Sequence, residues 1–425
     1  MTPPLKRHVA AVVIGNALEF YDFTTYAYFA AQIGHAFFPF KTPVLSLLAS
    51  LAAFGIGFLG RPVGGVLIGA YGDRKGRRPA MLLSFALMGA AILAFVFMPT
   101  YAQIGLAAPV LVVIIRFVQG IAVGGDVGPT TAFLLEVAPP ERRGFYTALQ
   151  YSSQGVSTLC AGIAGVALAN LLDAQQLQDF GWRIALGAGA AILPFGLLIR
   201  RALPETLHAP PHDGALPLDA PARLDAKTWR VIVLGFFMLG SATVGFYAIA
   251  FLTTFASQFL HMKTNTAFAA TLVFGAANVA FSALAGHLSD RYGRKPVMLI
   301  PRVLFLGAIW PAFYLIVHNR DAATLLGAAL VLGALGQMSV TSFVALSEAL
   351  PKTLRSASLA TTYALAISIF GGTAQFNITW LLHATGDLMV PAWYLIVATL
   401  VGLVAMALMD ETAPVKTRIR RDALP

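Results

Sequence analysis

Charged residues are scarce in this sequence of 425 residues: they make up 11% of it, against roughly 25% in soluble domains. Hydrophobic residues make up 58%, which leaves too little polar surface for a soluble fold. Cysteine is nearly absent, and with Cys160 alone no disulfide can form within the chain. The sequence has no phosphate-binding G-x-x-x-x-G-K-[ST] loop, no nucleophile elbow and no metal-ligand cluster. We therefore expect no enzyme, no cofactor and no metal site.

In place of charge, the chain has apolar runs of about 20 residues, the length that crosses a hydrocarbon core of ~30 Å. Such runs recur along the chain and indicate a membrane protein. The predicted helices are at residues 9–31, 45–71, 80–99, 108–135, 146–170, 183–202, 229–257, 266–288, 297–317, 322–348, 356–383 and 391–409.

Lysine and arginine are distributed unevenly among the predicted loops. Of 29 in total, 22 lie in loops on the side of the N-terminus and four in the opposite loops, and Arg61, Arg116 and Arg302 fall inside helices. Cytoplasmic loops carry the excess of basic residues, so both termini are predicted to be cytoplasmic. The net charge of +10 follows from the same loops, and no nucleic-acid partner is needed to explain it.

One charged motif occurs once in each half of the chain. The first copy is GAYGDRKGRRP, residues 69–79, and the second is GHLSDRYGRKP, residues 286–296. Their shared skeleton is G-x-x-x-D-R-x-G-R-[RK]-P. Two further pairs of segments recur in the same order, 134–145 with 346–357 and 204–206 with 410–412. Matches at half-chain spacing indicate an internal repeat.

These paired motifs resemble those of the major facilitator superfamily, and the resemblance covers the whole chain. It implies an all-α membrane protein with twelve transmembrane helices in two pseudo-symmetric six-helix bundles, both termini being cytoplasmic. A central site would be reached alternately from each side. In this interpretation residues 1–202 form the first bundle, 203–228 a cytoplasmic linker, and 229–425 the second bundle with a cytoplasmic tail.

Five charged side chains lie well inside the predicted helices of the first half: Glu19, Asp22, Arg61, Arg116 and Asp126. A charge near the bilayer centre costs ~2.5–3.5 kcal/mol on insertion scales, so each is expected to face a partner or a water-filled cavity. Glu19 and Asp22 are three residues apart and share a helix face, which favours a proton carrier over a purely structural pair. For Asp126, a packing or gating role is an equal alternative. Glu19, Asp22 and Asp126 are the predicted proton-coupling residues.

Arg61 lies ~18 Å from the helix boundary at Asp73, too deep for its side chain to reach the membrane surface. Its guanidinium suits bidentate binding of a substrate carboxylate. The alternative is permanent pairing with Glu19 or Asp22, and the two are compatible if the substrate competes for the same arginine.

The second half is poorer in buried charge. Arg302 is ~9 Å from Pro296, and we expect it to reach the interface, which leaves neutral polar groups opposite the charges of the first half. The predicted substrate-binding residues are Asn16, Arg61, Arg116, Gln119, Gln150, Tyr151, Gln154, Tyr247 and Gln375.

Within the superfamily, the segments GNALEFYDF, RPVGG and RFVQGIAVGGD resemble the metabolite:proton symporters. A narrower resemblance, to citrate/tricarballylate:proton symporters, rests on GFYTALQYSSQGVS and FGWRIALGAGAAILPFGLLIRRALPET, and on FVALSEALP, SIFGG and GDLMVPAWYL. It implies import of a tricarboxylate with H⁺ as the coupling ion. Another carboxylate metabolite, such as α-ketoglutarate, shikimate, proline or betaine, is the alternative, and a solute sensor ranks below it. We expect a monomer in a bacterial inner membrane whose partners are the lipid bilayer and a small carboxylate.

The family pattern also implies a cytoplasmic gate that ties the halves together. Its predicted members are Asp73, Arg77, Arg78, Glu136, Arg143, Glu205, Asp290, Arg294, Glu348, Arg355 and Glu411. Solvated loop charges, which contribute ~0–1 kcal/mol per pair, are the alternative. The duplication of the motif favours the gate.

Overall fold

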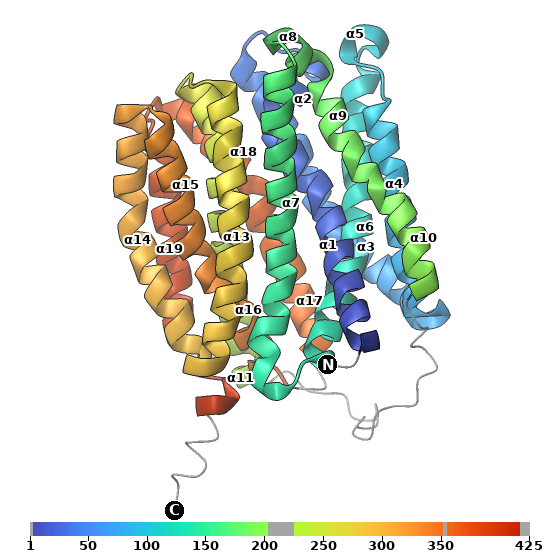
Figure 1. The fold of residues 1–425 in the computed structure, drawn as a ribbon, viewed down its shortest axis with the longest axis vertical. Coiled ribbons are helices and arrows are strands. Elements are labelled where there is room, and N and C mark those ends of the chain that lie inside the picture. Colours follow the sequence, from blue (N-terminus) through green and yellow to red (C-terminus); the bar gives the residue numbers. More distant parts are fainter. Residues whose placement is uncertain (1–2, 203–224, 352–354, 417–425) are drawn as a thin grey trace, which may run out of the picture.

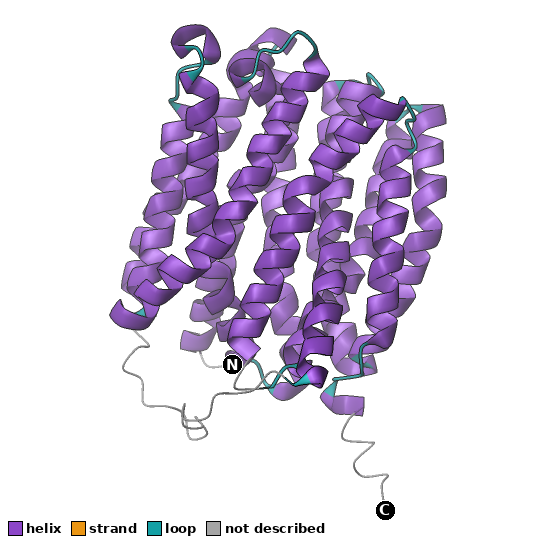
Figure 2. Ribbon diagram, turned by 180° about the vertical axis from the view of Figure 1, so that it is seen from behind, coloured by secondary structure: helices purple, strands orange, loops and turns teal. Residues whose placement is uncertain are grey.

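The structure, a computed structural model, describes residues 3–202, 225–351 and 355–416. These residues form helices joined by short connections and contain no strand (Figure 2). The helices run roughly parallel to one another between two ends of the molecule (Figure 1). We call the end where α3 and α13 terminate, at Lys75 and Tyr292, the lower end, and the other end the upper end, as they appear in Figure 1.

The elements of the first half follow the predicted order. They are α1 (Pro3–Tyr28), α2 (Ala30–Phe37), α3 (Pro43–Lys75), α4 (Arg77–Val96), α5 (Tyr101–Ile104), α6 (Ala107–Val137), the 3-10 turn η1 (Pro140–Arg142), α7 (Arg143–Leu171), α8 (Ala174–Gln176), the π turn η2 (Leu177–Gly181), α9 (Trp182–Gly187), the 3-10 turn η3 (Ala188–Ala191) and α10 (Ile192–Ala202).

The second half repeats this pattern of long helices. Its elements are α11 (Ala226–Ala250), α12 (Leu252–Thr254), the π turn η4 (Phe255–Phe259), α13 (Thr264–Tyr292), α14 (Arg294–Asn319), α15 (Ala322–Gln337), the 3-10 turn η5 (Met338–Val340), α16 (Thr341–Ala349), α17 (Arg355–Ala366), the π turn η6 (Ile367–Gly371), α18 (Gly372–Thr385) and α19 (Val390–Leu408).

Helices occur at every place where the apolar runs predict them. Among the described residues, ten helical stretches are long and apolar enough to cross a membrane. The other two predicted places are α1, which carries several polar residues, and the stretch from α9 to α10, which η3 interrupts. The α9–α10 stretch also runs between the two ends of the molecule (Figure 1).

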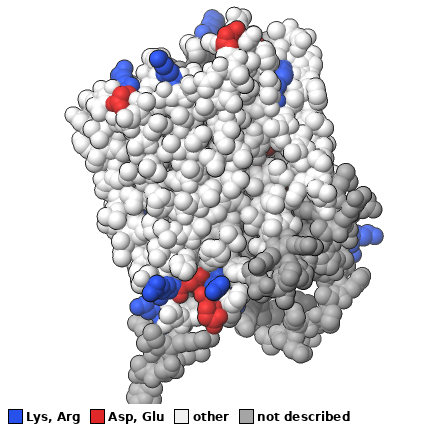
Figure 3. Space-filling model, viewed as in Figure 1, with Lys and Arg blue, Asp and Glu red and all other residues white. Residues whose placement is uncertain are grey.

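The outer surface between the two ends is apolar. Large aliphatic side chains in mid-helix positions are exposed, for example Val66 at 70%, Val397 at 62% and Val404 at 59%. Charged side chains gather at the two ends, and the surface between them is uncharged over most of its height (Figure 3). An exposed apolar surface of this extent is suited to lipid and not to water. The fold is that of a multi-pass membrane protein.

The repeated charged motif forms the same turn in both halves. Its central glycines, Gly76 and Gly293, have φ angles of +114° and +104°, which L side chains rarely adopt. Each ends one long helix and begins the next, from α3 to α4 and from α13 to α14. The motif therefore needs glycine at this position because the chain reverses direction there within one residue.

The two halves of the chain pack closely through glycines. A Cβ on Gly155 of α7 would lie 2.6 Å from the backbone nitrogen of Val279 in α13, and one on Gly55 of α3 would lie 2.6 Å from the carbonyl oxygen of Gly372 in α18. Small residues allow such backbone approach between membrane helices. Near the upper end, the Asn265 amide donates a hydrogen bond of 2.8 Å to Asn170. These contacts bring α3 and α7 of one half against α18 and α13 of the other.

Candidate functional site

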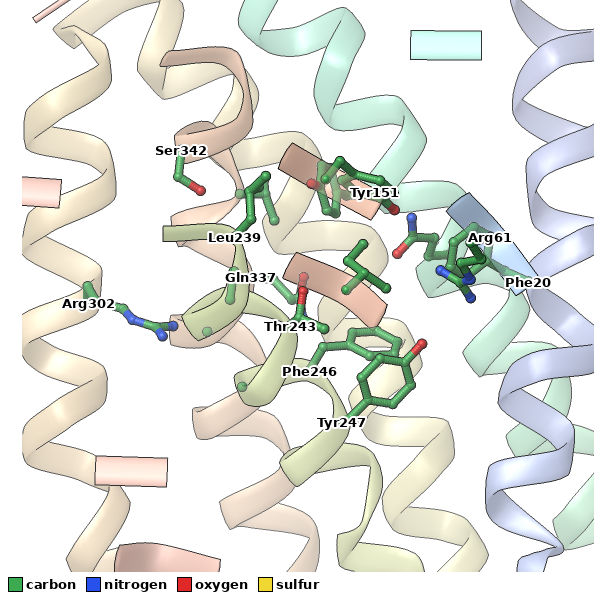
Figure 4. A pocket seen from close by; sticks show the side chains of 17 residues that line it. Phe20, Arg61, Tyr151, Leu239, Thr243, Phe246, Tyr247, Arg302, Gln337 and Ser342 are labelled. Carbon is green, nitrogen blue, oxygen red and sulfur yellow. The ribbon is translucent and has the colours of Figure 1, made fainter. Parts of the chain in front are cut away.

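A cavity with about 680 Å³ of empty space, part of it open to solvent, lies between the two halves of the chain (Figure 4). Among the described residues that line it, none is acidic. The polar lining side chains are Arg61, Tyr151 and Gln154 from the first half, and Thr243, Tyr247, Arg302, Gln337, Ser342 and Tyr363 from the second. Two arginines and a ring of neutral donors therefore face one space.

Arg61 reaches the cavity from α3 and is 3% exposed. Its three guanidinium nitrogens make no hydrogen bond of ordinary geometry to a described residue, although the Tyr247 hydroxyl interacts with the guanidinium. Aromatic rings surround it instead, with the guanidinium carbon 4.3 Å from the ring centre of Phe58 and 4.7 Å from that of Phe23. Ring faces attract a cation without consuming its N–H donors. Arg61 is thus held in position while its donors stay available to a ligand.

The backbone next to Arg61 is tied to the other half. Pro62 has no N–H, so the carbonyl of Phe58, four residues before it in α3, has no partner within the helix. The Ser368 hydroxyl in η6 supplies the missing hydrogen bond at 2.7 Å. The position of Arg61 is consequently set in part by the second half of the chain.

Arg116 differs from Arg61 in having an acidic partner. Its Nη1 donates to Asp22 Oδ2 at 2.8 Å, and both side chains are fully buried. Tyr26 covers the guanidinium, whose carbon lies 3.7 Å from the ring centre. The pairing considered for Arg61 is therefore made by Arg116. Gln119, one turn further along α6, is also fully buried.

Several predicted substrate-binding residues lie outside the cavity lining. Asn16 donates to the carbonyl of Gln150 at 3.2 Å and to the hydroxyl of Ser153 at 2.6 Å, which joins α1 to α7. Gln375 donates to the carbonyl of Tyr247 at 3.3 Å and joins α18 to α11. These side chains hold the helices around the cavity. Of the nine predicted substrate-binding residues, the lining contains Arg61, Tyr151, Gln154 and Tyr247.

The predicted proton-coupling residues have different surroundings. Glu19 is fully buried and lies one turn before Asp22 in α1. The side chain of Asp126 lies outside the described residues. No three His, Cys, Asp or Glu side chains in the described part of the chain are close enough together to hold a metal ion.

Arg302 corrects the expectation that it reaches the membrane interface. It is 0% exposed and lines the cavity, and its Nη2 donates to the carbonyl and the hydroxyl of Ser241. The depth of a residue along α14 was the only guide in the sequence, and it does not tell which side of the helix faces lipid. The second half therefore also carries buried charge, at Arg302 and at Arg294.

At the lower end, Asp290 connects the two halves. Its carboxylate oxygens accept hydrogen bonds from the backbone nitrogens of Gly144 and Phe145, at 2.8 and 2.9 Å, in the first turn of α7. A carboxylate at a helix N-terminus is stabilised by the free N–H groups and by the helix dipole. Arg294 donates to the same carboxylate at 2.6 Å.

Arg294 also connects α14 to other elements of the second half. It binds Glu348 with two nitrogens, at 3.1 and 3.0 Å, in the bidentate arrangement that arginine and carboxylate favour. Glu411 accepts hydrogen bonds from the backbone nitrogens of Arg294 and Lys295, at 2.9 and 3.0 Å, and so caps α14. Four predicted gate residues, Asp290, Arg294, Glu348 and Glu411, thus form one hydrogen-bonded network.

The remaining predicted gate residues are not placed in a network. Arg143 is half-buried at the start of α7, and its Nε has no hydrogen bond among the described residues. Glu205 lies outside the described residues, as do the side chains of Asp73, Arg77, Arg78, Glu136 and Arg355.

Sequence reasoning missed half of the cavity. Besides Arg302, it left Thr243, Gln337, Ser342 and Tyr363 out of the predicted site. A lone glutamine such as Gln337 within an apolar helix is a signal that could have been used. The hydroxyl residues carry no such signal, because serine and threonine also satisfy their own helix backbone.

The comparisons with known proteins agree with the fold. A family model described as Major Facilitator Superfamily matches residues 12–370. The citrate-proton symporter of Klebsiella pneumoniae is 33% identical over 415 residues, covering 97% of this chain and 94% of the relative. That of Salmonella typhi is 34% identical over 406 residues, covering 94% and 93%. The proline/betaine transporter of Salmonella typhimurium is 29% identical over 424 residues, covering 96% and 84%.

Solved structures show the same fold at lower sequence identity. A D-xylose-proton symporter superposes with a TM-score of 0.77 at 20% identity, over 96% of this chain and 98% of the other. A partially occluded, inward-open form of the xylose transporter XylE from E. coli gives 0.78 at 16% identity, with 96% and 98% covered. At these identities the likeness concerns the fold alone.

Proposed function

The chain belongs to the major facilitator superfamily, a family of transporters, and from this premise we propose that it is a proton-coupled symporter that imports a carboxylate by alternating access. The observation that carries the proposal is Arg61. It is a buried cation in a cavity between the halves, and it has no hydrogen bond of ordinary geometry to a described residue. A buried charge left in this state favours a ligand of the opposite sign.

The substrate we propose is a tricarboxylate such as citrate or tricarballylate. Two relatives named as citrate-proton symporters match nearly the full length of this chain. The cavity offers cationic and neutral donor groups, and its described lining has no acidic group that would repel a polyanion.

A second candidate is a zwitterion such as proline or betaine. It is favoured by relatives named as proline/betaine transporters, which match 96% of this chain at 29–30% identity. A zwitterion also needs an acidic or aromatic site for its cationic end. Tyr247 and Phe246 supply rings in the cavity, but no described lining residue supplies a carboxylate.

For proton coupling, we propose that Asp22 or Glu19 takes up the proton. Protonation of Asp22 would remove the charge that holds Arg116, and the arginine would then be free to interact with the incoming anion. Release of the substrate would restore the ion pair. Asp126 remains a proposed member of the same group. Relatives named as proton symporters support H⁺ as the coupling ion.

The topology belongs to the same proposal. Twelve transmembrane helices, with bundles at residues 1–202 and 229–425 and a linker between them, would put both termini in the cytoplasm. The lower end would then be cytoplasmic, and the network around Asp290 and Arg294 would be the gate. We place the protein as a monomer in a bacterial inner membrane, as its bacterial relatives suggest.

The test of the function is uptake of labelled citrate into proteoliposomes with an inward proton gradient. We expect concentrative uptake that ends when the gradient is collapsed. Arg61→Gln is expected to lower citrate affinity at least about tenfold, because a charge-assisted hydrogen bond contributes ~1.5–3 kcal/mol. Arg230→Gln is the matched control, since Arg230 is exposed and its one hydrogen bond among the described residues goes to the carbonyl of Leu408. Absence of citrate uptake in sealed vesicles would contradict the tricarboxylate proposal, and a competition panel of carboxylates would follow.

The proton and gate assignments have separate tests. Equal, gradient-dependent uptake in wild type, Asp22→Asn and Glu19→Gln would eliminate both carboxylates as proton carriers. Asp290→Asn is expected to slow uptake while leaving citrate binding intact, because the change loosens the contact between halves at a distance from the cavity. Unchanged uptake in Asp290→Asn would remove the gate from the proposal.

A further inference from the structure

Arg302 is a buried cation that the sequence places at the membrane interface and the structure places in the cavity. It lies eight residues, or ~12 Å, along α14 from Arg294. Its side chain is 0% exposed. The guanidinium lies between α11 and α19: its Nη1 would be 3.6 Å from a Cβ on Gly245, and its Nη2 would be 3.7 Å from one on Gly402. Glycines at these points leave room for it.

The charge of Arg302 is not compensated within the described chain. The ion pairs of the described residues are Arg116 with Asp22, and Arg294 with Asp290 and with Glu348; none involves Arg302. Nη2 bonds to Ser241, while Nε has no partner among the described residues. A lone serine supplies dipoles but no negative charge. Burial of an uncompensated guanidinium is unfavourable, and an anion in the adjacent cavity would offset that cost.

Arg302 and Arg61 approach the cavity from opposite sides. In Figure 4, Arg61 extends from α3 on one side and Arg302 from α14 on the other, with Thr243 and Gln337 between them. One arginine belongs to the first half of the chain and the other to the second. A ligand that forms an ion pair with each arginine carries negative charge at two separate points.

We propose that Arg302 forms a second carboxylate subsite and sets the preference of this protein for substrates with two or more carboxylates. This inference rests on the proposed function, in which Arg61 binds the first carboxylate. A tricarboxylate would place one carboxylate on each arginine, so that it bridges the halves. A zwitterion with one carboxylate on Arg61 would bring its cationic end toward a second cation, which is a repulsive element against that class.

The test compares three probes on purified protein by isothermal titration calorimetry: tricarballylate, butyrate and glycine betaine. Wild type is expected to bind tricarballylate at least about tenfold more tightly than butyrate or betaine. Arg302→Gln is expected to weaken tricarballylate binding by about tenfold or more and butyrate binding less, because butyrate has one carboxylate and cannot pair with both arginines. Arg61→Gln is expected to weaken both, and the exposed-site control Arg230→Gln to weaken neither.

The outcomes separate the two proposals. If folded Arg302→Gln binds tricarballylate as tightly as wild type while Arg61→Gln does not, the second subsite is wrong and the proposed function stands. If wild type binds betaine but not tricarballylate, both are wrong. If Arg302→Gln does not fold, Arg302→Lys keeps the charge but loses the planar fork. A larger loss of tricarballylate affinity than of butyrate affinity in that variant supports the subsite, and equal losses for the two probes overturn it.

Discussion

Arg61 and Arg116 are two buried arginines of the same half, and their surroundings differ. Arg116 is paired with Asp22 and covered by Tyr26, and both of these contacts come from the first half of the chain. Arg61 has aromatic neighbours and no acidic partner among the described residues, and its helix is bonded to Ser368 of the second half. One arginine is neutralised within its own half. The other lies at the junction of the halves, where a ligand and a relative movement of the halves would both reach it.

The largest expected effect comes from removing the partner of Arg116. Asp22→Asn would leave a fully buried arginine without a counter-charge, and breaking a buried pair costs ~3–5 kcal/mol. We expect a marked fall in the free energy of unfolding, measured by denaturant titration in detergent micelles. Arg61→Gln is expected to cause no comparable loss, because it breaks no ion pair in the described structure.

A double variant tests whether the loss comes from the uncompensated charge. Asp22→Asn combined with Arg116→Gln removes both charges, and replacing a buried pair by neutral groups is often close to neutral. We therefore expect the double variant to be more stable than Asp22→Asn alone. An additive loss in the double variant would show that the pair matters through packing and not through charge.

An intermediate effect is expected at the close contact between α3, which contains Arg61, and α6, which contains Arg116. A Cβ on Gly120 of α6 would overlap the carbonyl oxygen of Gly57 in α3 and lie 3.1 Å from the Cα of Gly60. Gly120→Ala must push the helices apart, and such overpacking typically costs ~1–3 kcal/mol. Because both arginines are attached to this contact, the variant is expected to lose stability and citrate affinity together.

Gly69→Ala is the matched control for Gly120→Ala. Gly69 also lies in α3, but a Cβ there would meet nothing within 4 Å. We expect this change to leave stability unchanged or to raise it by ~0.4–1 kcal/mol, since alanine restricts the unfolded chain. Equal losses in the two variants would mean that glycine is needed for helix geometry and not for the close contact.

The difference between the two arginines also marks the limit of what sequence can predict. Apolar runs gave the positions of the long helices, because length and composition alone decide whether a segment can cross a membrane. The turn glycines Gly76 and Gly293 could also be found from sequence, because the motif around each turn is local and occurs in both halves. The choice of partner was not visible: both arginines are single charges in apolar helices, and Asp22 lies in another helix altogether.

Arg302 shows a second limit of prediction from sequence. Its depth along α14 was predicted, but the direction of its side chain depends on how α14 is rotated against α11 and α19. The apolar residues of a membrane helix face both lipid and protein, so the sequence gives only a weak signal of rotation. Arg302 was missed for this reason. Polarity alone therefore does not separate the residues that were found, such as Arg61 and Gln154, from those that were missed, such as Arg302.

The smallest expected effect isolates the dependence of Arg61 on the second half. Ser368→Ala removes the hydrogen bond to the Phe58 carbonyl, which Pro62 leaves without a helical partner, and such a loss costs ~1–3 kcal/mol at most. We expect a several-fold change in citrate affinity, measured by calorimetry. The coupling energy between Asp22 and Arg116 in a double-mutant cycle should stay the same, because that pair lies within the first half. Thr373→Ala is the control, since in the described part of the chain the Thr373 hydroxyl bonds to the carbonyl of Ile369, four residues before it. A change in the Asp22–Arg116 coupling energy would mean that Arg116 also depends on the second half. It would contradict the proposed difference between the two arginines.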